Sequence, residues 1–129
     1  MGNIYSAQNV AAYFIYELNE QKGFINSQTL QQLLAILDKQ WQITYGHSVF
    51  LEETFALNQY GYVVREIEVA YKENGNQHIE LPAKDWYLEY GQFQLAYRTY
   101  GIPPFTKEEE RLVKKTIEYY ETVHIKKVS

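Results

Sequence analysis

The stretch NSQTLQQLLAILDKQWQITYG, residues 26–46, carries the strongest periodic signal in the chain. Its apolar residues recur every three or four positions, which is the spacing of one face of an α-helix. Asn26 or Ser27 can cap the start of this helix, and Gly46 can end it. The predicted buried stripe consists of Leu30, Leu33, Leu34, Leu37, Trp41 and Tyr45.

Two further apolar residues, Ile36 and Ile43, lie beside this stripe. They predict a wide buried face, and therefore a helix at the centre of the fold. On the N-terminal side of this helix, residues 6–22 predict another one, because apolar residues again recur every four positions. Ser6 is placed to cap it, since a serine hydroxyl can accept a hydrogen bond from a free amide of the first turn.

Three more helices are predicted on the C-terminal side. Residues 63–75 predict a third helix, and residues 106–126 predict the last one. Thr106 and Glu109 have the spacing of a capping box at the start of the last helix. Between these two, residues 86–100 predict a fourth helix from aromatic residues spaced by four, three, four and three: Trp86, Tyr90, Phe93, Tyr97 and Tyr100.

The period changes between residues 47 and 59, where Phe55 and Leu57 alternate with smaller residues. Alternation is typical of a short strand or extended segment. We therefore predict one domain, residues 1–129, of mainly α class. It would be a compact bundle of about five helices, with a small β or extended element between the second and third.

Composition excludes several classes of function. The 129 residues contain no cysteine, which rules out disulfides, thiolate nucleophiles and sulfur-ligated zinc. The net charge of −4 leaves no strongly basic surface, so binding of nucleic acid is not expected. Neither a membrane-spanning segment nor a secretory signal is recognisable, so a cytoplasmic location is expected, with no membrane partner.

The ionisable residues show no catalytic pattern. His47, His78 and His124 lie in three separate segments, without metal-ligand spacing. The acidic run 108–110 suits the first turn of a helix, where negative charge interacts favourably with the helix dipole. We therefore predict that the protein is not an enzyme and has no catalytic residue, metal or cofactor. A small enzyme remains the alternative if the histidines and glutamates converge in a pocket.

Tyrosine is the unusual component, with 13 residues. Five of these tyrosines exceed what one small core would bury: Tyr60, Tyr62, Tyr87, Tyr100 and Tyr119. Exposed tyrosine supplies a large contact area at a low entropic cost, so it is favoured in protein interfaces. Base stacking would need a basic groove as well. The tyrosines therefore favour a protein partner over a nucleic acid.

The order of these motifs resembles the Panacea domain family, which includes SocA-like antitoxins and phage-associated GepA-like proteins. The similar segments are NVAAYFI at 9–15, LQQLL and onward to Trp41 at 30–41, YGHSVF at 45–50, ETFA at 53–56, YGYVVREI at 60–67 and the acidic helix at 106–120. The chain differs at Tyr62 and Arg65, where the family has proline, and at Gln32, where it has lysine. It also ends before the family's C-terminal motif, as a divergent and shortened member would.

The resemblance implies an antitoxin that neutralises a cognate toxin by direct, non-catalytic binding. The negative charge of this chain would steer it towards a basic toxin. We expect the contact around Tyr60, Tyr62, Arg65, Trp86 and Tyr87. The alternative is a phage- or mobile-element-associated regulator that binds nucleic acid. That function would require a basic face and a steep dependence of DNA binding on salt.

Overall fold

A computed structural model describes residues 2–52, 54–57, 61–89, 91 and 94–128. These residues form four α-helices, one short 3₁₀ helix and two two-stranded antiparallel sheets. The elements in chain order are α1 (Ala7–Glu20), α2 (Ser27–Tyr45), β1 (Thr54–Leu57), β2 (Gly61–Val64), α3 (Arg65–Ala70), η1 (Lys72–Asn74), β3 (Lys84–Glu89), β4 (Gln94–Thr99) and α4 (Lys107–Val128).

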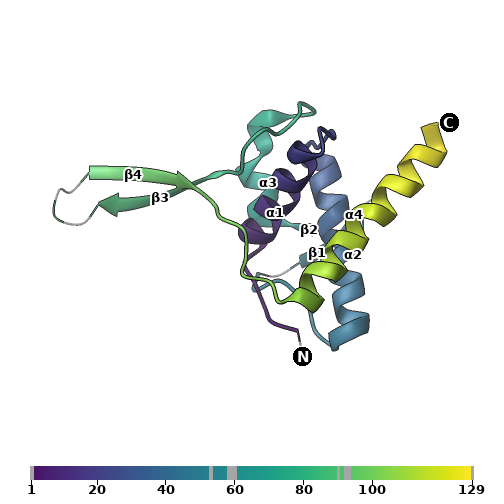
Figure 1. Ribbon diagram of the computed structural model, residues 1–129. Coiled ribbons are helices and arrows are strands. Elements are labelled where there is room, and N and C mark those ends of the chain that lie inside the picture. Colours follow the sequence, from purple (N-terminus) through teal and green to yellow (C-terminus); the bar gives the residue numbers. More distant parts are fainter. Residues whose placement is uncertain (1, 53, 58–60, 90, 92–93, 129) are drawn as a thin grey trace.

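The chain divides into a helical body and one projecting hairpin (Figure 1). The body contains all four helices and the β1–β2 sheet, and α2 contacts α1, α3, α4 and β2. The central position predicted for α2 is therefore confirmed. Its apolar stripe is fully buried at Leu30, Leu33, Leu34, Leu37 and Trp41. The predicted wide face is wrong at Ile43, whose side chain is 70% exposed.

The predicted helix ends are confirmed at three caps. Asn26 caps α2, because its side chain accepts from the Thr29 N–H at 2.8 Å. Gly46 ends α2 in the left-handed conformation, with φ +83°. The capping box of α4 is complete: Glu109 N–H donates to the Thr106 hydroxyl at 3.1 Å, and Thr106 N–H donates to the Glu109 carboxylate at 2.9 Å.

The extended element expected after α2 is the first strand of the β1–β2 sheet, whose register runs from Thr54↔Val64 to Leu57↔Gly61. The buried side chain of Gln31 on α2 fixes this sheet to the body. Its amide accepts from the Val64 N–H and donates to the Val64 carbonyl, both at 3.1 Å. The predicted third helix is correspondingly shorter than 63–75, because β2 takes its first residues and only α3 and η1 follow.

The predicted fourth helix over 86–100 is wrong. These residues form the β3–β4 hairpin, with six antiparallel pairs from Lys84↔Thr99 to Glu89↔Gln94. A spacing of four fits one face of a strand as well as a helix, since strand faces repeat every two residues. Gly91 has φ +85°, a conformation that a helix interior does not contain. The described residues therefore form four helices rather than about five, and the hairpin makes the molecule less compact than predicted.

No helix in the described ranges is both long enough and apolar enough to cross a bilayer.

Candidate functional site

In the described part of the chain, the hydrogen bonds that hold the β3–β4 hairpin, called the arm below, to the body lie at its root. The buried hydroxyl of Tyr71 accepts from the Ala83 N–H at 2.8 Å, and the Tyr16 and Thr99 hydroxyls lie 3.3 Å apart. Burial raises the pKa of Tyr71 to about 12. Among the described residues, no hydrogen bond joins the strands to the body beyond Thr99. The arm therefore extends from the body with both faces towards solvent (Figure 1).

One face of the arm is apolar. Cross-strand pairing places Trp86 opposite Tyr97 and Leu88 opposite Leu95, so all four side chains share a face. Their exposed fractions are 54%, 51%, 60% and 69% in that order. The rings of Trp86 and Tyr97 have centroids 5.0 Å apart and form a cross-strand aromatic pair. We call these four residues the apolar face.

A lysine covers the root end of this face. The Lys84 Nζ lies 4.4 Å from the Tyr97 ring centroid and 5.7 Å from that of Trp86. Both distances are within the range of cation–π attraction. This contact orders the two rings, but leaves each about half exposed.

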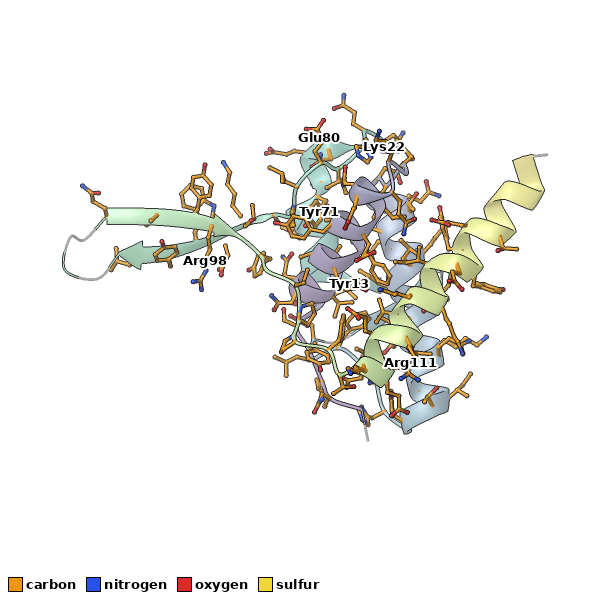
Figure 2. All side chains as sticks on the ribbon, viewed as in Figure 1. Tyr13, Lys22, Tyr71, Glu80, Arg98 and Arg111 are labelled. Atoms are coloured by element: carbon orange, nitrogen blue, oxygen red, sulfur yellow. The ribbon has the colours of Figure 1, made fainter. Side chains whose placement is uncertain are left out.

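The opposite face is more polar. Arg98 forms an ion pair with Asp85 at 3.4 Å, and its guanidinium lies 5.3 Å from the Tyr87 ring centroid. Figure 2 shows Arg98 on the arm, well away from the labelled body residues Tyr13 and Arg111. An exposed ion pair of this kind contributes little stability. An isolated two-stranded hairpin is only marginally stable in water, so a covering surface would stabilise the arm.

A cavity of about 560 Å³ lies at the root of the arm, and Trp86 of the apolar face is one of the residues that line it. The cavity also includes Val69 from α3 and Leu81 from the connector, which are 68% and 63% exposed. Val69 and Leu81 therefore share this cavity with Trp86, and polar side chains such as Gln8, Lys72 and Glu73 line it as well.

Of the five contact residues that the sequence predicts, the structure describes the side chains of three, Arg65, Trp86 and Tyr87, and these lie on different surfaces. Trp86 and Tyr87 are both on β3, but they point to opposite faces of the arm. Arg65 is exposed at the start of α3, on the body. Tyr60 lies outside the described residues. Tyr62 pairs with Ala56 in the β1–β2 sheet, but its side chain also lies outside the described part.

Three residues of the apolar face were not predicted from the sequence to lie on the contact surface: Leu88, Leu95 and Tyr97. The available signal was a spacing of two, which is that of one face of a strand. It separates Trp86 from Leu88 and Leu95 from Tyr97, on either side of Gly91. Read together, these features are typical of a hairpin.

Two histidines of the body, His47 and His78, make structural hydrogen bonds. His78 accepts from the Ile25 N–H at 3.1 Å and lies 2.7 Å from the Asn19 side-chain oxygen. The two nitrogens of the His47 ring lie within 2.9 Å of the carbonyl oxygens of Ser48 and Gly2. Over the residues that the structure describes, no three histidine or acidic side chains are grouped so that they could hold a metal ion.

Comparison of the chain with protein-family models, with curated proteins and with solved structures finds no match. The resemblance to the Panacea family therefore stays a prediction.

Proposed function

We propose that this protein is a protein-binding module and that the arm is its contact surface. The observation that carries the proposal is the apolar face, four large side chains each more than half exposed on an element that projects from the body. Burying such a face gives a favourable free energy of about 25 cal/mol per Å² of apolar area. Trp86, Tyr97 and Tyr87 are also of the residue types that dominate binding energy in protein interfaces.

A protein partner suits the arm better than a nucleic acid. The two strands contain two basic residues, Lys84 and Arg98, and two acidic residues, Asp85 and Glu89, so they have no excess positive charge. Both cations already lie over aromatic rings. Phosphate binding needs surplus cations, and the whole chain has a net charge of −4. The surface therefore favours an apolar or mixed partner surface.

We also propose the narrower role that the family resemblance implies, neutralisation of a toxin by direct binding. A hairpin with six residues in each strand is about 20 Å long, enough to enter a cleft on a partner. An inserted apolar face would block such a cleft without chemistry by the antitoxin itself. This role rests on the resemblance, whereas the arm supplies the physical means.

The test pairs the chain with the product of the adjacent open reading frame. That product is expressed alone, with the wild-type chain, and with the arm variant Leu88→Ser/Leu95→Ser. This variant removes two exposed aliphatic side chains from the apolar face and leaves the Trp86–Tyr97 pair intact. The matched control, Leu51→Ser/Ile102→Ser, removes two aliphatic side chains that are 75% and 57% exposed elsewhere.

We expect growth arrest by the neighbour alone, rescue and a purified complex with the wild-type chain, and loss of both only in the arm variant. A harmless neighbour that forms a complex through the arm would refute the toxin role and keep the binding role. A complex that the arm variant leaves unchanged would refute the arm as the contact surface.

A further inference from the structure

A second candidate surface lies on the body, along the seam between α2 and α4. Two adjoining cavities of about 190 and 260 Å³ follow this seam and share Leu112 and Lys115 in their linings. We call the two together the seam groove. Residues 108–119 of α4 form one side of it, and residues 36–45 of α2 form the other.

The floor of the 190 Å³ cavity is mainly apolar and open to solvent. Leu112 and Tyr119 are seven residues apart on one face of α4, and Tyr119 is 60% exposed. Across the groove, Ile36 lines it from α2. Leu112, Tyr119 and Ile36 together offer an apolar floor that the apolar face of a third helix can contact.

The rim of the seam groove is positively charged. Arg111 and Lys115, one helical turn apart, line it together with a single carboxylate, Glu108. In the part of the chain that the structure describes, the only ion pair is Arg98–Asp85 on the arm, so neither rim cation has an ionic partner. Like charges one turn apart repel each other. The groove is thus a net positive site on a chain whose net charge is −4. Figure 2 shows Arg111 on α4, away from the arm.

We propose that the seam groove binds an acidic amphipathic helix of a partner protein. Leucine-like side chains at helical spacing would fill the floor, and carboxylates on the flanks of the helix would pair with Arg111 and Lys115. The stretch 108–119 is about 16 Å long, which matches about three turns of bound helix. The site shares no residue with the arm, so it stands or falls separately from the proposed function.

The probe is a fluorescein-labelled peptide of about 15 residues, long enough for four helical turns, with leucines at helical spacing and glutamates elsewhere. Fluorescence anisotropy on the full chain measures its Kd at physiological salt. The Arg111→Glu/Lys115→Glu variant should raise this Kd at least about tenfold. The control, Lys107→Glu/Lys114→Glu, changes the net charge equally on exposed positions of the same helix, and should leave the Kd within about twofold. Circular dichroism confirms that both variants are folded.

Two further peptides separate the groove from nonspecific attraction. A scrambled peptide of the same composition and a lysine-for-glutamate peptide should both bind at least about tenfold more weakly. Equal binding of all three peptides, no binding of the acidic peptide, or equal effects of the two double variants would each overturn the proposal. A dimer that disappears in Arg111→Glu/Lys115→Glu would overturn it in favour of a second copy as the occupant of the groove.

Discussion

Glu109 is the residue that links the two ends of the fold. This carboxylate is buried, with 1% exposure, and accepts hydrogen bonds from the Asn3 N–H at 2.7 Å and the Tyr5 hydroxyl at 2.5 Å. It also accepts from the Thr106 N–H within the capping box. Burial raises the pKa of Glu109, but the hydrogen bonds from Thr106, Tyr5 and Asn3 outweigh burial and hold the pKa below its usual 4.5.

Glu109→Gln should lower the free energy of unfolding at neutral pH by about 1–3 kcal/mol. The glutamine amide is neutral and has one acceptor oxygen, so it cannot replace the charged carboxylate as the acceptor for all of these donors. A carboxylate with a lowered pKa stabilises the fold above its unfolded pKa, and that stability is lost as the pH falls through the folded value. The difference in the free energy of unfolding between wild type and variant should therefore become smaller below about pH 4.5. Urea unfolding at several pH values measures this difference. A gap that does not change with pH, or an equal effect of the exposed Glu108→Gln, would contradict this role.

Lys22 is the described non-glycine residue with positive φ, at +60°. It follows the cap of α1, where the Lys22 N–H bonds to the Asn19 carbonyl and the Gly23 N–H to the Leu18 carbonyl. This is the Schellman arrangement, in which the left-handed position favours glycine. Here the residue with positive φ is the lysine, and the glycine follows it.

Lys22→Gly should raise the free energy of unfolding by about 0.5–1 kcal/mol, because relief of the left-handed strain exceeds the extra entropy of an unfolded glycine. Thermal and urea unfolding measure the change. Lys22→Ala keeps the strain, so it should give no gain. Equal stabilisation by both substitutions would show that the side chain, rather than the backbone conformation, is responsible.

At the scale of the element, the arm depends on its root. Tyr71 is 2% exposed, and its hydroxyl is the acceptor for the Ala83 N–H just before β3. Ala83 in turn accepts from the Tyr100 N–H at 3.1 Å, one step beyond β4. These bonds set the direction in which the arm leaves the body.

Tyr71→Phe should remove one acceptor and cost about 1–3 kcal/mol, the penalty of an unpaired N–H group. Native-state hydrogen exchange should accelerate at Ala83 and Tyr100 more than within α2. Tyr119→Phe, at an exposed tyrosine on α4, should change neither the stability nor the exchange at Ala83 and Tyr100. Uniform acceleration across the body would indicate a general loss of stability rather than a loosened root.

The helices show which elements the sequence could predict. The α2 stripe is continuous, its caps are of standard type, and its partners surround it, so local pattern and burial agree. The arm has no body against which one face could be buried, and Tyr87 adds an aromatic residue to the opposite face of β3, so the alternation along this strand is weak. Nor could a sequence pattern predict that the Gln31 side chain would pair with Val64 as a neighbouring strand does.

The sequence likewise predicted only some residues of the candidate site. Trp86 and Tyr87 were identified as contact residues from their aromatic character alone, and the structure leaves both exposed on the arm. The spacing of Leu88, Leu95 and Tyr97 indicated a hairpin, but only the pairing of β3 with β4 places them on one face with Trp86. Residue type thus indicated part of the surface, whereas its extent depended on tertiary structure.

At the scale of the whole molecule, buried phenols make the fold sensitive to alkali. Burial raises the pKa values of Tyr5 and Tyr71 to about 12, and also raises that of Tyr13. An acid with a raised folded pKa binds its proton more tightly in the folded state. Its contribution to stability is therefore complete below about pH 10 and is lost as the pH rises towards about 12.

Tyrosinate absorbance should consequently rise in two phases on titration with alkali. Exposed tyrosines should ionise first, without loss of helicity, and the buried ones should ionise together with unfolding. Far-ultraviolet circular dichroism recorded on the same samples distinguishes the phases. A single phase near pH 10 with intact helicity would contradict the burial of these hydroxyls.

The central claim is that this protein binds its partner through the arm. Hydrogen–deuterium exchange of the partner complex tests it most directly, since it reports burial along the whole chain in one measurement. We expect slower exchange in peptides that cover residues 81–99 and no comparable change in α1. Exchange in the arm that is the same with and without bound partner would contradict it.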